Sequence, residues 1–226
     1  MTRSILFDTE TTGLEPAQGH RVIEIAALEL INDLPTGAHF HALIDPERDI
    51  PDDATRIHGI TASHLRGKPR FPEIVADLLA FLADGPLVAH NAPFDFGFLN
   101  AEFSRTGHPP LDPARMVDTL AMAKLRFPGL PNSLDALCRR FGIDLSARTT
   151  HNALLDCRLL AEVYVELTGG RQRGLILADE ASEGLATARY DPIGPRTPLR
   201  IVPTAAELAA HAAFVARLKD PVWSSP

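Results

Sequence analysis

Five side chains spread along this chain of 226 residues form one chemical set of four acids and a histidine. They are Asp8, Glu10, Asp95, His151 and Asp156. Each acid lies against apolar sequence, where burial of an unpaired carboxylate is costly. Four carboxylates and an imidazole that converge on one point would form a site for two divalent cations and a water nucleophile. Such a site can hydrolyse phosphodiesters.

The first two acids follow a short apolar run. Residues 4–8 (Ser-Ile-Leu-Phe-Asp) predict a buried strand. Because Asp8 and Glu10 are two positions apart, an extended backbone projects both side chains from one face. Two ordinary surface acids would explain Asp-x-Glu equally well. The apolar strand before the pair and the Thr-Thr-Gly-Leu sequence after it favour a functional site.

The later acids each lie near the start of a predicted helix. In the helix predicted over residues 152–167, Asp156 falls on the apolar stripe, three and four positions before Leu159 and Leu160. Asp95 lies in the first turn of a helix that begins near Phe94. A helix N-terminus stabilises a carboxylate, so capping is the alternative explanation for either acid. Three acidic motifs of this kind together favour a metal cluster.

His151 precedes Asp156 by five residues, which is about 140° around an ideal helix. The two side chains therefore cannot share a helical face, and we expect His151 on the loop that enters the helix. An imidazole suits a general base that activates water. A single histidine is otherwise often structural, and only its place beside Asp156 favours catalysis. Oxygen ligands with few nitrogens favour Mg²⁺ or Mn²⁺ over zinc.

The composition sets limits on the class of protein. The formal net charge is −7, and apolar residues make up 45% of the chain. No apolar stretch approaches the roughly 18 residues of a membrane span, and we expect a cytoplasmic protein. Cys138 and Cys157 lack disulfide or metal-site spacing. An acidic protein binds nucleic acid poorly by itself, so metal ions and a delivering partner would have to supply much of the attraction for such a substrate.

Element and domain boundaries follow from periodicity and turn signals. Besides residues 4–8, strands are expected at 22–31, 38–44 and 87–89, and helices at 71–83, from 94, and at 118–126, 133–141 and 152–167. We expect a catalytic domain over residues 1–170 and a proline-containing linker over 171–203. Residues 204–226 begin with a capping box, Thr204 to Glu207, and are expected to form a short helix and tail.

In their order these motifs resemble the DEDDh 3′–5′ exonuclease family, which is named after its four acids and histidine and has a ribonuclease H-like fold. More narrowly, the chain is similar to the proofreading subunits of bacterial replicative DNA polymerases. The likeness covers nearly the whole chain and runs through residues 20–25, 58–61, 117–120, 127–129, 133–138, 168–170, 199–202 and 207–211. Asn152 departs from the pattern, because the family usually has glycine after the histidine.

The resemblance implies an α/β fold in which helices flank a five-stranded mixed sheet, with a C-terminal tether and short helix. It assigns metal binding to Asp8, Glu10, Asp95 and Asp156, and water activation to His151. It implies a terminal-nucleotide pocket that involves Thr9, Thr12, Leu14, His58, Asn91 and Phe94. Asp118 is interpreted as a helix cap. The remaining histidines of the body are interpreted as structural: His20, His39, His41, His64, His90 and His108.

The tail carries two candidate docking segments. The segment from Gln172 to Leu177 resembles a sliding-clamp-binding peptide, although an exposed loop with several aliphatic residues explains it as well. The terminal helix and Trp223, the single tryptophan, have no domain of their own to pack against. The resemblance identifies the polymerase catalytic subunit as their partner and adds a theta-like small subunit as a further candidate.

These observations predict a two-metal 3′–5′ exonuclease that releases nucleoside 5′-monophosphates from single-stranded or mismatched DNA ends and proofreads for the replicative polymerase. A stand-alone exonuclease of the same family that acts on RNA or short oligonucleotides is the first alternative. Such an enzyme would not need the tether and terminal helix. A non-enzymatic binding module is the second alternative, and the complete ligand set argues against it.

Overall fold

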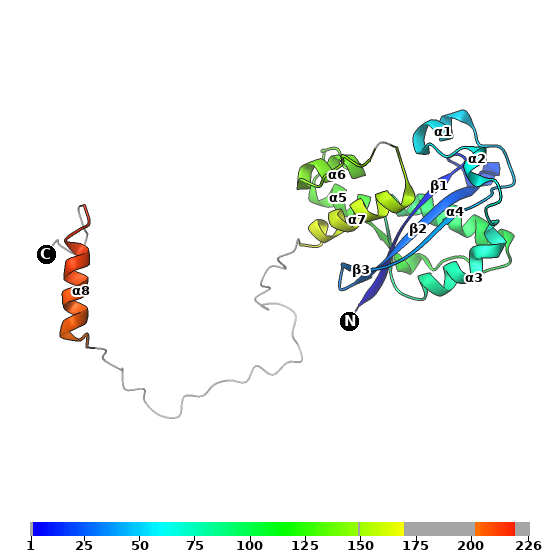
Figure 1. The fold of residues 1–226 in the computed structure, drawn as a ribbon. Helices are drawn as coiled ribbons and strands as arrows, with labels where there is room; N and C mark the ends of the chain where they lie inside the picture. Colours follow the sequence, from blue (N-terminus) through cyan, green and yellow to red (C-terminus); the bar gives the residue numbers. More distant parts are fainter. Residues whose placement is uncertain (1, 149, 170–201, 220–226) are drawn as a thin grey trace, which may run out of the picture. The chain divides into compact units, whose positions relative to one another are not determined.

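The computed structural model describes residues 2–148, 150–169 and 202–219 (Figure 1). The chain divides into two units. The first contains the sheet and helices α1 to α7, and the second contains helix α8 (Ala205–Val215).

The first unit is built on a five-stranded sheet with the order β3-β2-β1-β4-β5. Its strands are β1 (Arg3–Thr11), β2 (Val22–Ile31), β3 (Leu34–Leu43), β4 (Leu87–Ala89) and β5 (Met116–Asp118). Strand β1 pairs antiparallel with β2 and parallel with β4; β2–β3 is antiparallel and β4–β5 is parallel. The prediction of a five-stranded mixed sheet is confirmed.

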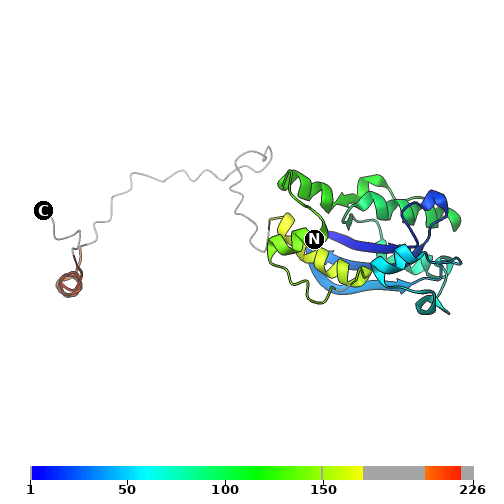
Figure 2. The same cartoon turned by 90° about the horizontal axis from the view of Figure 1, so that it is seen from above.

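Helices cover both faces of this sheet (Figures 1 and 2). They are α1 (Asp52–His58), α2 (Ala62–Leu65), α3 (Phe71–Leu82), α4 (Ala92–Arg105), α5 (Thr119–Arg126), α6 (Leu134–Phe141) and α7 (Ala153–Leu167), with short 3₁₀ turns η1 (Pro16–Gln18) and η2 (Pro113–Arg115). One core cluster joins the sheet to α3 and α4, and another joins it to α5, α6 and α7. Helix α7 packs along β1 and β2.

Alternation along β1 decides which face each acid reaches. Ile5 and Phe7 belong to the core cluster with α3 and α4, whereas Leu6 belongs to the cluster with α7. Because side chains alternate along a strand, Asp8 and Glu10 follow Leu6 onto the α7 face. The expected common face is therefore present. Both acids lie inside β1, which continues three residues beyond the predicted end at residue 8.

Strands β2 and β4 have the predicted bounds, but β3 begins earlier, at Leu34 instead of residue 38. The reason is a tight turn in which Asn32 and Asp33 have φ of 51° and 66°. Such a two-residue turn pairs Ile31 directly with Leu34. Pro35 is tolerated in β3 because this strand forms an edge of the sheet.

Helix α8 begins directly after Thr204, whose hydroxyl and Glu207 form the predicted capping box. Its large apolar side chains are exposed, including Leu208 at 56% and Phe214 at 51%. The clamp-like segment from Gln172 to Leu177 and Trp223 lie outside the described residues. Within the described parts of the chain, no helix has the length and apolar character needed to cross a membrane.

Candidate active site

The five predicted catalytic residues meet in one cleft of about 540 Å³. Its lining consists of Asp8, Thr9, Glu10, His90, Phe94, Asp95, Leu120, Ser133, Leu134, Asp135, Arg148, His151 and Asp156. The acids come from three elements: β1, the first turn of α4 and the first turn of α7. Segments about 150 residues apart in the chain thus contribute to one site.

Asp95 is held against β1 by Thr9. The Thr9 backbone N–H and hydroxyl donate to Asp95 Oδ1 at 3.0 and 2.7 Å. Helix α4, which carries Asp95, is itself fixed at its start because Asp118 accepts the backbone N–H groups of Asn91 and Ala92. Asp118 also accepts Leu120 N–H and caps α5, which confirms its interpretation as a helix cap.

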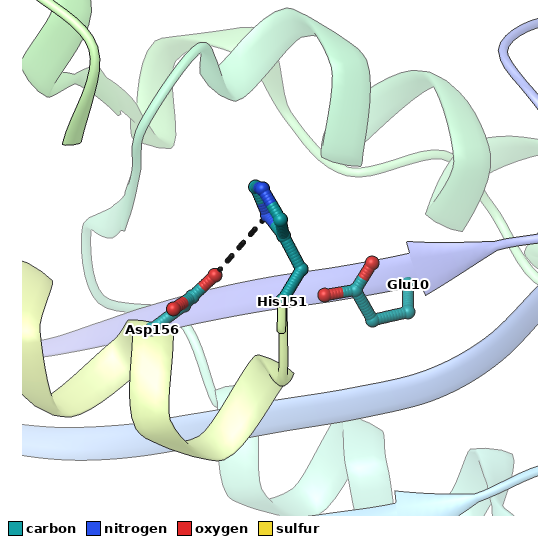
Figure 3. Close-up of side chains that lie close together, drawn as sticks. All are labelled: Glu10, His151 and Asp156. Atoms are coloured by element: carbon teal, nitrogen blue, oxygen red, sulfur yellow. Dashed lines mark ion pairs between the residues drawn. The ribbon is translucent and has the colours of Figure 1, made fainter. Parts of the chain in front are cut away.

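His151 lies on the loop that enters α7, as the spacing predicted. Asn152 caps this helix by accepting Leu155 N–H at 3.0 Å, and the His151 backbone N–H donates to the Ile57 carbonyl of α1. With its backbone fixed in this way, His151 can direct its imidazole toward the first turn of α7. Its Nδ1 lies 3.4 Å from Asp156 Oδ2 (Figure 3).

Glu10, His151 and Asp156 form a group that could hold a metal ion. Each offers a ligand atom, and these atoms all lie within 4.8 Å of one another. Figure 3 shows Glu10 on its strand next to the histidine and aspartate of the α7 start. Carboxylate oxygens predominate in the cleft, and a set of hard oxygen donors with one imidazole suits a divalent cation such as Mg²⁺ or Mn²⁺.

The carboxylates also repel one another. Burial and the neighbouring Asp95 and Glu10 hold the pKa of Asp8 well above its usual range. Burial and Asp156 raise the pKa of Glu10 to about 8, and burial raises the pKa of Asp95 to about 7. Such concentrated negative charge creates a strong attraction for divalent cations.

Arg148 is a site residue that the sequence analysis missed. Its Nε and Nη2 donate to the two oxygens of Asp156 at 2.6 and 2.7 Å, and Nη1 donates to Asp135 at 2.5 Å. Burial alone would raise the pKa of Asp156, but hydrogen bonds from Arg148 and His151 lower it below its ordinary value. In the sequence, the role of Arg148 is indicated only by a basic residue three positions before His151. Such a residue belongs to no periodic pattern, so the sequence did not identify it.

Glu24 is another site residue that the sequence analysis missed, although it lies within residues 20–25, one of the segments that resemble the family. It is directly opposite Glu10 in the β1–β2 pairing and is almost fully buried. His41 Nε2 contacts Glu24 Oε1 at 2.7 Å, and the Asn152 side chain and the Ala153 backbone N–H donate to its carboxylate at 3.2 Å. Glu24 therefore ties the start of α7 to β2. An acid within an apolar strand is the signal that could have identified it.

Of the six residues expected to form the nucleotide pocket, two lie in the lining of the cleft and four do not. Thr9 and Phe94 line the cleft, whereas Thr12, Leu14, His58 and Asn91 are not part of its lining. Thr12 is buried and contacts His20 at 3.1 Å. His58 is buried and accepts Ile60 N–H, Leu14 is 73% exposed, and Asn91 is exposed at the start of α4.

The raised pKa values predict how pH affects stability in the absence of metal. A carboxyl group with a raised folded-state pKa binds more protons in the folded chain than in the unfolded chain, so stability falls as pH rises. For Glu10 the window runs from its ordinary value of 4.5 to about 8. In EDTA, calorimetry should show the free energy of unfolding falling by more than about 1 kcal/mol across this window.

Excess Mn²⁺ should remove most of this loss, because cations neutralise the ionised acids. Glu10→Gln should make the profile in EDTA shallower, and the remaining slope comes from Asp8 and Asp95, whose pKa values are also raised. Asp156 has a lowered pKa and acts in the opposite sense only below its ordinary value of 3.8. Stability in EDTA that increases between pH 5 and pH 8 would contradict this repulsion among the carboxylates.

Similarity to known proteins defines the class. A family model described as an exonuclease matches residues 5–164. Exonuclease X, solved with 5′ overhanging duplex DNA, is 26% identical, with a TM-score of 0.58 over 75% of this chain and 92% of that one. E. coli exonuclease I with a dA16 oligonucleotide is 21% identical, with a TM-score of 0.61 over 74% of this chain and 41% of that one, and supports the fold alone. These matches define an exonuclease with a ribonuclease H-like fold.

Comparison with curated relatives identifies a subgroup of exonucleases that the chain resembles in both sequence and length. The chain is 49% identical over 221 residues to DNA polymerase III subunit epsilon of Rickettsia conorii, covering 96% of both proteins. It is 41% identical over 225 residues to the subunit of the same name from Escherichia coli K12, covering 94% of this chain and 92% of that protein. The chain therefore belongs to the exonuclease family, among the DNA polymerase III epsilon subunits.

The prediction of a 3′–5′ proofreading exonuclease is confirmed by these matches. The family depends on divalent metal ions, and the cleft contains a side-chain group suited to one. Similarity to DNA polymerase III subunits and to a structure solved with DNA supports DNA binding and a role with polymerase III.

Proposed function

We propose that Asp8, Glu10, Asp95 and Asp156 hold two Mg²⁺ or Mn²⁺ ions, and that this site shortens single-stranded or mismatched DNA from its 3′ end. The products are nucleoside 5′-monophosphates. The observation that carries the proposal is the convergence of these four acids with His151 in one cleft. Among the described residues, Asp8, Glu10 and Asp95 form no ion pair with an arginine or lysine, which fits acids whose partners are metal cations.

His151 is proposed as the general base. Asp156 lies 3.4 Å from its Nδ1 and can orient the ring and stabilise the imidazolium ion. Nε2 then accepts a proton from the attacking water and later releases it to solvent. Divalent cations bound by the carboxylates would supply positive charge that stabilises the attacking and leaving oxygens.

The terminal nucleotide is proposed to lie between β1 and the start of α4. Thr9 and Phe94 line the cleft there, and an aromatic ring offers a stacking surface for a base. Thr12, Leu14, His58 and Asn91 are proposed to contact the substrate around this position. Leu14 is highly exposed and can pack against a base once DNA is bound. A paired end must first unpair, which favours mismatched termini.

Residues 1–170 are proposed to carry out catalysis, residues 171–203 to form a tether, and residues 204–226 to dock onto a partner. Helix α8 exposes Leu208 and Phe214, which suits it to the catalytic alpha subunit of DNA polymerase III. The segment from Gln172 to Leu177 is proposed to bind the sliding clamp, and a theta-like subunit is a further candidate partner. Delivery by the polymerase offsets the weak DNA affinity of a chain with net charge −7.

A substrate comparison with the full chain tests this function. With Mn²⁺ or Mg²⁺, we expect 5′-labelled DNA with a mismatched 3′ end to be shortened one nucleotide at a time, faster than a matched end and faster than RNA of the same sequence. The full chain should also copurify with the alpha subunit, and a chain lacking residues 204–226 should not.

Asp8→Ala serves as the inactive control for a contaminating nuclease. Preference for RNA together with no copurification would favour the stand-alone exonuclease. Equal cleavage by wild type and Asp8→Ala would contradict the site assignment.

A further inference from the structure

The guanidinium group of Arg148 occupies the part of the cleft next to Asp156. The Arg148 side chain is only 10% exposed and contacts three other side chains in the cleft. It forms a two-pronged contact with both Asp156 oxygens, donates to Asp135, and its Nη2 lies 3.0 Å from His151 Nδ1. Paired Arg–carboxylate contacts of this kind are strong and directional.

In the described part of the chain, the Arg148–Asp156 contact gives one of the four acids a cationic partner that the other three lack. Among the residues that the structure describes, Asp156 is the one of the four with an arginine or lysine partner. It also belongs to the group, with Glu10 and His151, whose ligand atoms lie within 4.8 Å of one another. A metal ion in that group and the Arg148 guanidinium would therefore be two cations on the same carboxylate. Their mutual repulsion, together with the loss of lone pairs to Arg148, disfavours simultaneous binding.

Asp135 offers Arg148 a second anchor. It lies in the first turn of α6, on the other side of the guanidinium from Asp156, and its carboxylate is 2.5 Å from Nη1. The arginine can release Asp156 and keep this ion pair, so the movement leaves no unpaired buried cation.

We propose that Arg148 competes with the divalent cation for Asp156: it pairs with both Asp156 and Asp135 when the site is free of metal, and it keeps only Asp135 when a metal ion binds. Arg148 is thus a positioning residue that weakens one of the metal positions and keeps Asp156 and His151 ordered until that position is filled. This inference rests on the proposed role of Asp156 as a metal ligand.

The test measures Mn²⁺ binding to the full chain without DNA, by titration calorimetry. Arg148→Gln should bind Mn²⁺ about tenfold more tightly at one position than the wild type does. Arg139→Gln is the matched control, because this substitution removes the same charge from a residue that also pairs with Asp135. The Arg139 side chain is 71% exposed, whereas that of Arg148 is buried in the cleft. Arg139→Gln should change the affinity less than about twofold, since exposed charges are screened.

A second measurement follows thermal unfolding. In EDTA, Arg148→Gln should unfold at a lower temperature than the wild type, because Asp156 loses its partner, and saturating Mn²⁺ should raise its midpoint by more than it raises that of the wild type. If Arg148→Gln does not fold, Mn²⁺ binding is measured with Arg148→Lys instead. This variant keeps the positive charge but loses the two-pronged contact with Asp156. Tighter Mn²⁺ binding by this variant supports the proposal.

Unchanged or weaker Mn²⁺ binding in the Arg148 variants overturns the competition. The ligand assignment is tested separately with Asp156→Asn, which should lose one Mn²⁺ position. If Asp156→Asn binds as much Mn²⁺ as the wild type, the proposed function of Asp156 fails, and that result is distinct from a failure of Arg148 to compete.

Discussion

Replacement of Asp95 by asparagine is expected to lower exonuclease activity at least about a hundredfold and to stabilise the metal-free protein. Asp95 is 2% exposed, and burial raises its pKa to about 7, so its ionised form is costly without a cation. Asparagine has nearly the same shape, and its amide oxygen can still accept both bonds from Thr9. The lost negative charge removes stabilisation of bound metal worth several kcal/mol, and about 1.4 kcal/mol corresponds to tenfold in rate.

The measurement combines steady-state cleavage of a 5′-labelled oligonucleotide with thermal unfolding in EDTA at pH 8. Asp118→Asn is the matched control, because Asp118 lies near the start of α4 and its charge also raises the pKa of Asp95. Asparagine at position 118 keeps an oxygen that can accept the capping bonds, and activity should stay within about threefold. Loss of activity together with loss of folding in Asp95→Asn would contradict the proposed role.

His151→Ala is expected to lower kcat by about 10² to 10⁴, the range typical of a lost general base. KM for the oligonucleotide should change little, because the half-exposed imidazole acts on the water and not on substrate binding. Its loss removes one side chain from a loop that is fixed by the backbone bond to Ile57 and by the Asn152 cap, so the fold should persist.

His90→Ala provides the comparison for His151→Ala. His90 lines the same cleft, but its Nδ1 contacts Thr119 and not an acid of the site. We expect less than about tenfold loss of kcat. Equal losses for the two histidines, or a His151 variant that changes KM alone, would exclude His151 as the base.

The acids were predictable because a buried charge conflicts with its apolar surroundings. Asp8 and Glu10 alternate with buried residues in β1, and Asp156 interrupts the apolar stripe of α7. Three such acidic motifs favoured a shared metal cluster, and the family resemblance assigned the ligands, but convergence itself depends on the order of strands in the sheet. The Thr9–Asp95 contact joins residues 86 positions apart, and no local pattern encodes it.

Other parts of the site escaped prediction for identifiable reasons. Strand β5 has three residues that are all only partly buried, and α1 has seven, so neither shows an apolar pattern like that of the equally short but fully buried β4. Yet the α1 carbonyl of Ile57 holds the backbone of the His151 loop. Arg148 and Glu24 act through side chains that reach across elements, so their roles emerge only from the assembled fold.

The most direct test of the account is a crystal structure of the full chain soaked with Mn²⁺ and a nucleoside 5′-monophosphate, with anomalous differences measured for manganese. We expect two peaks about 3.5 to 4 Å apart in the cleft, bound by oxygens of Asp8, Glu10, Asp95 and Asp156. Manganese at other places, with these four carboxylates unligated, would contradict the claim that the acids share divalent cations.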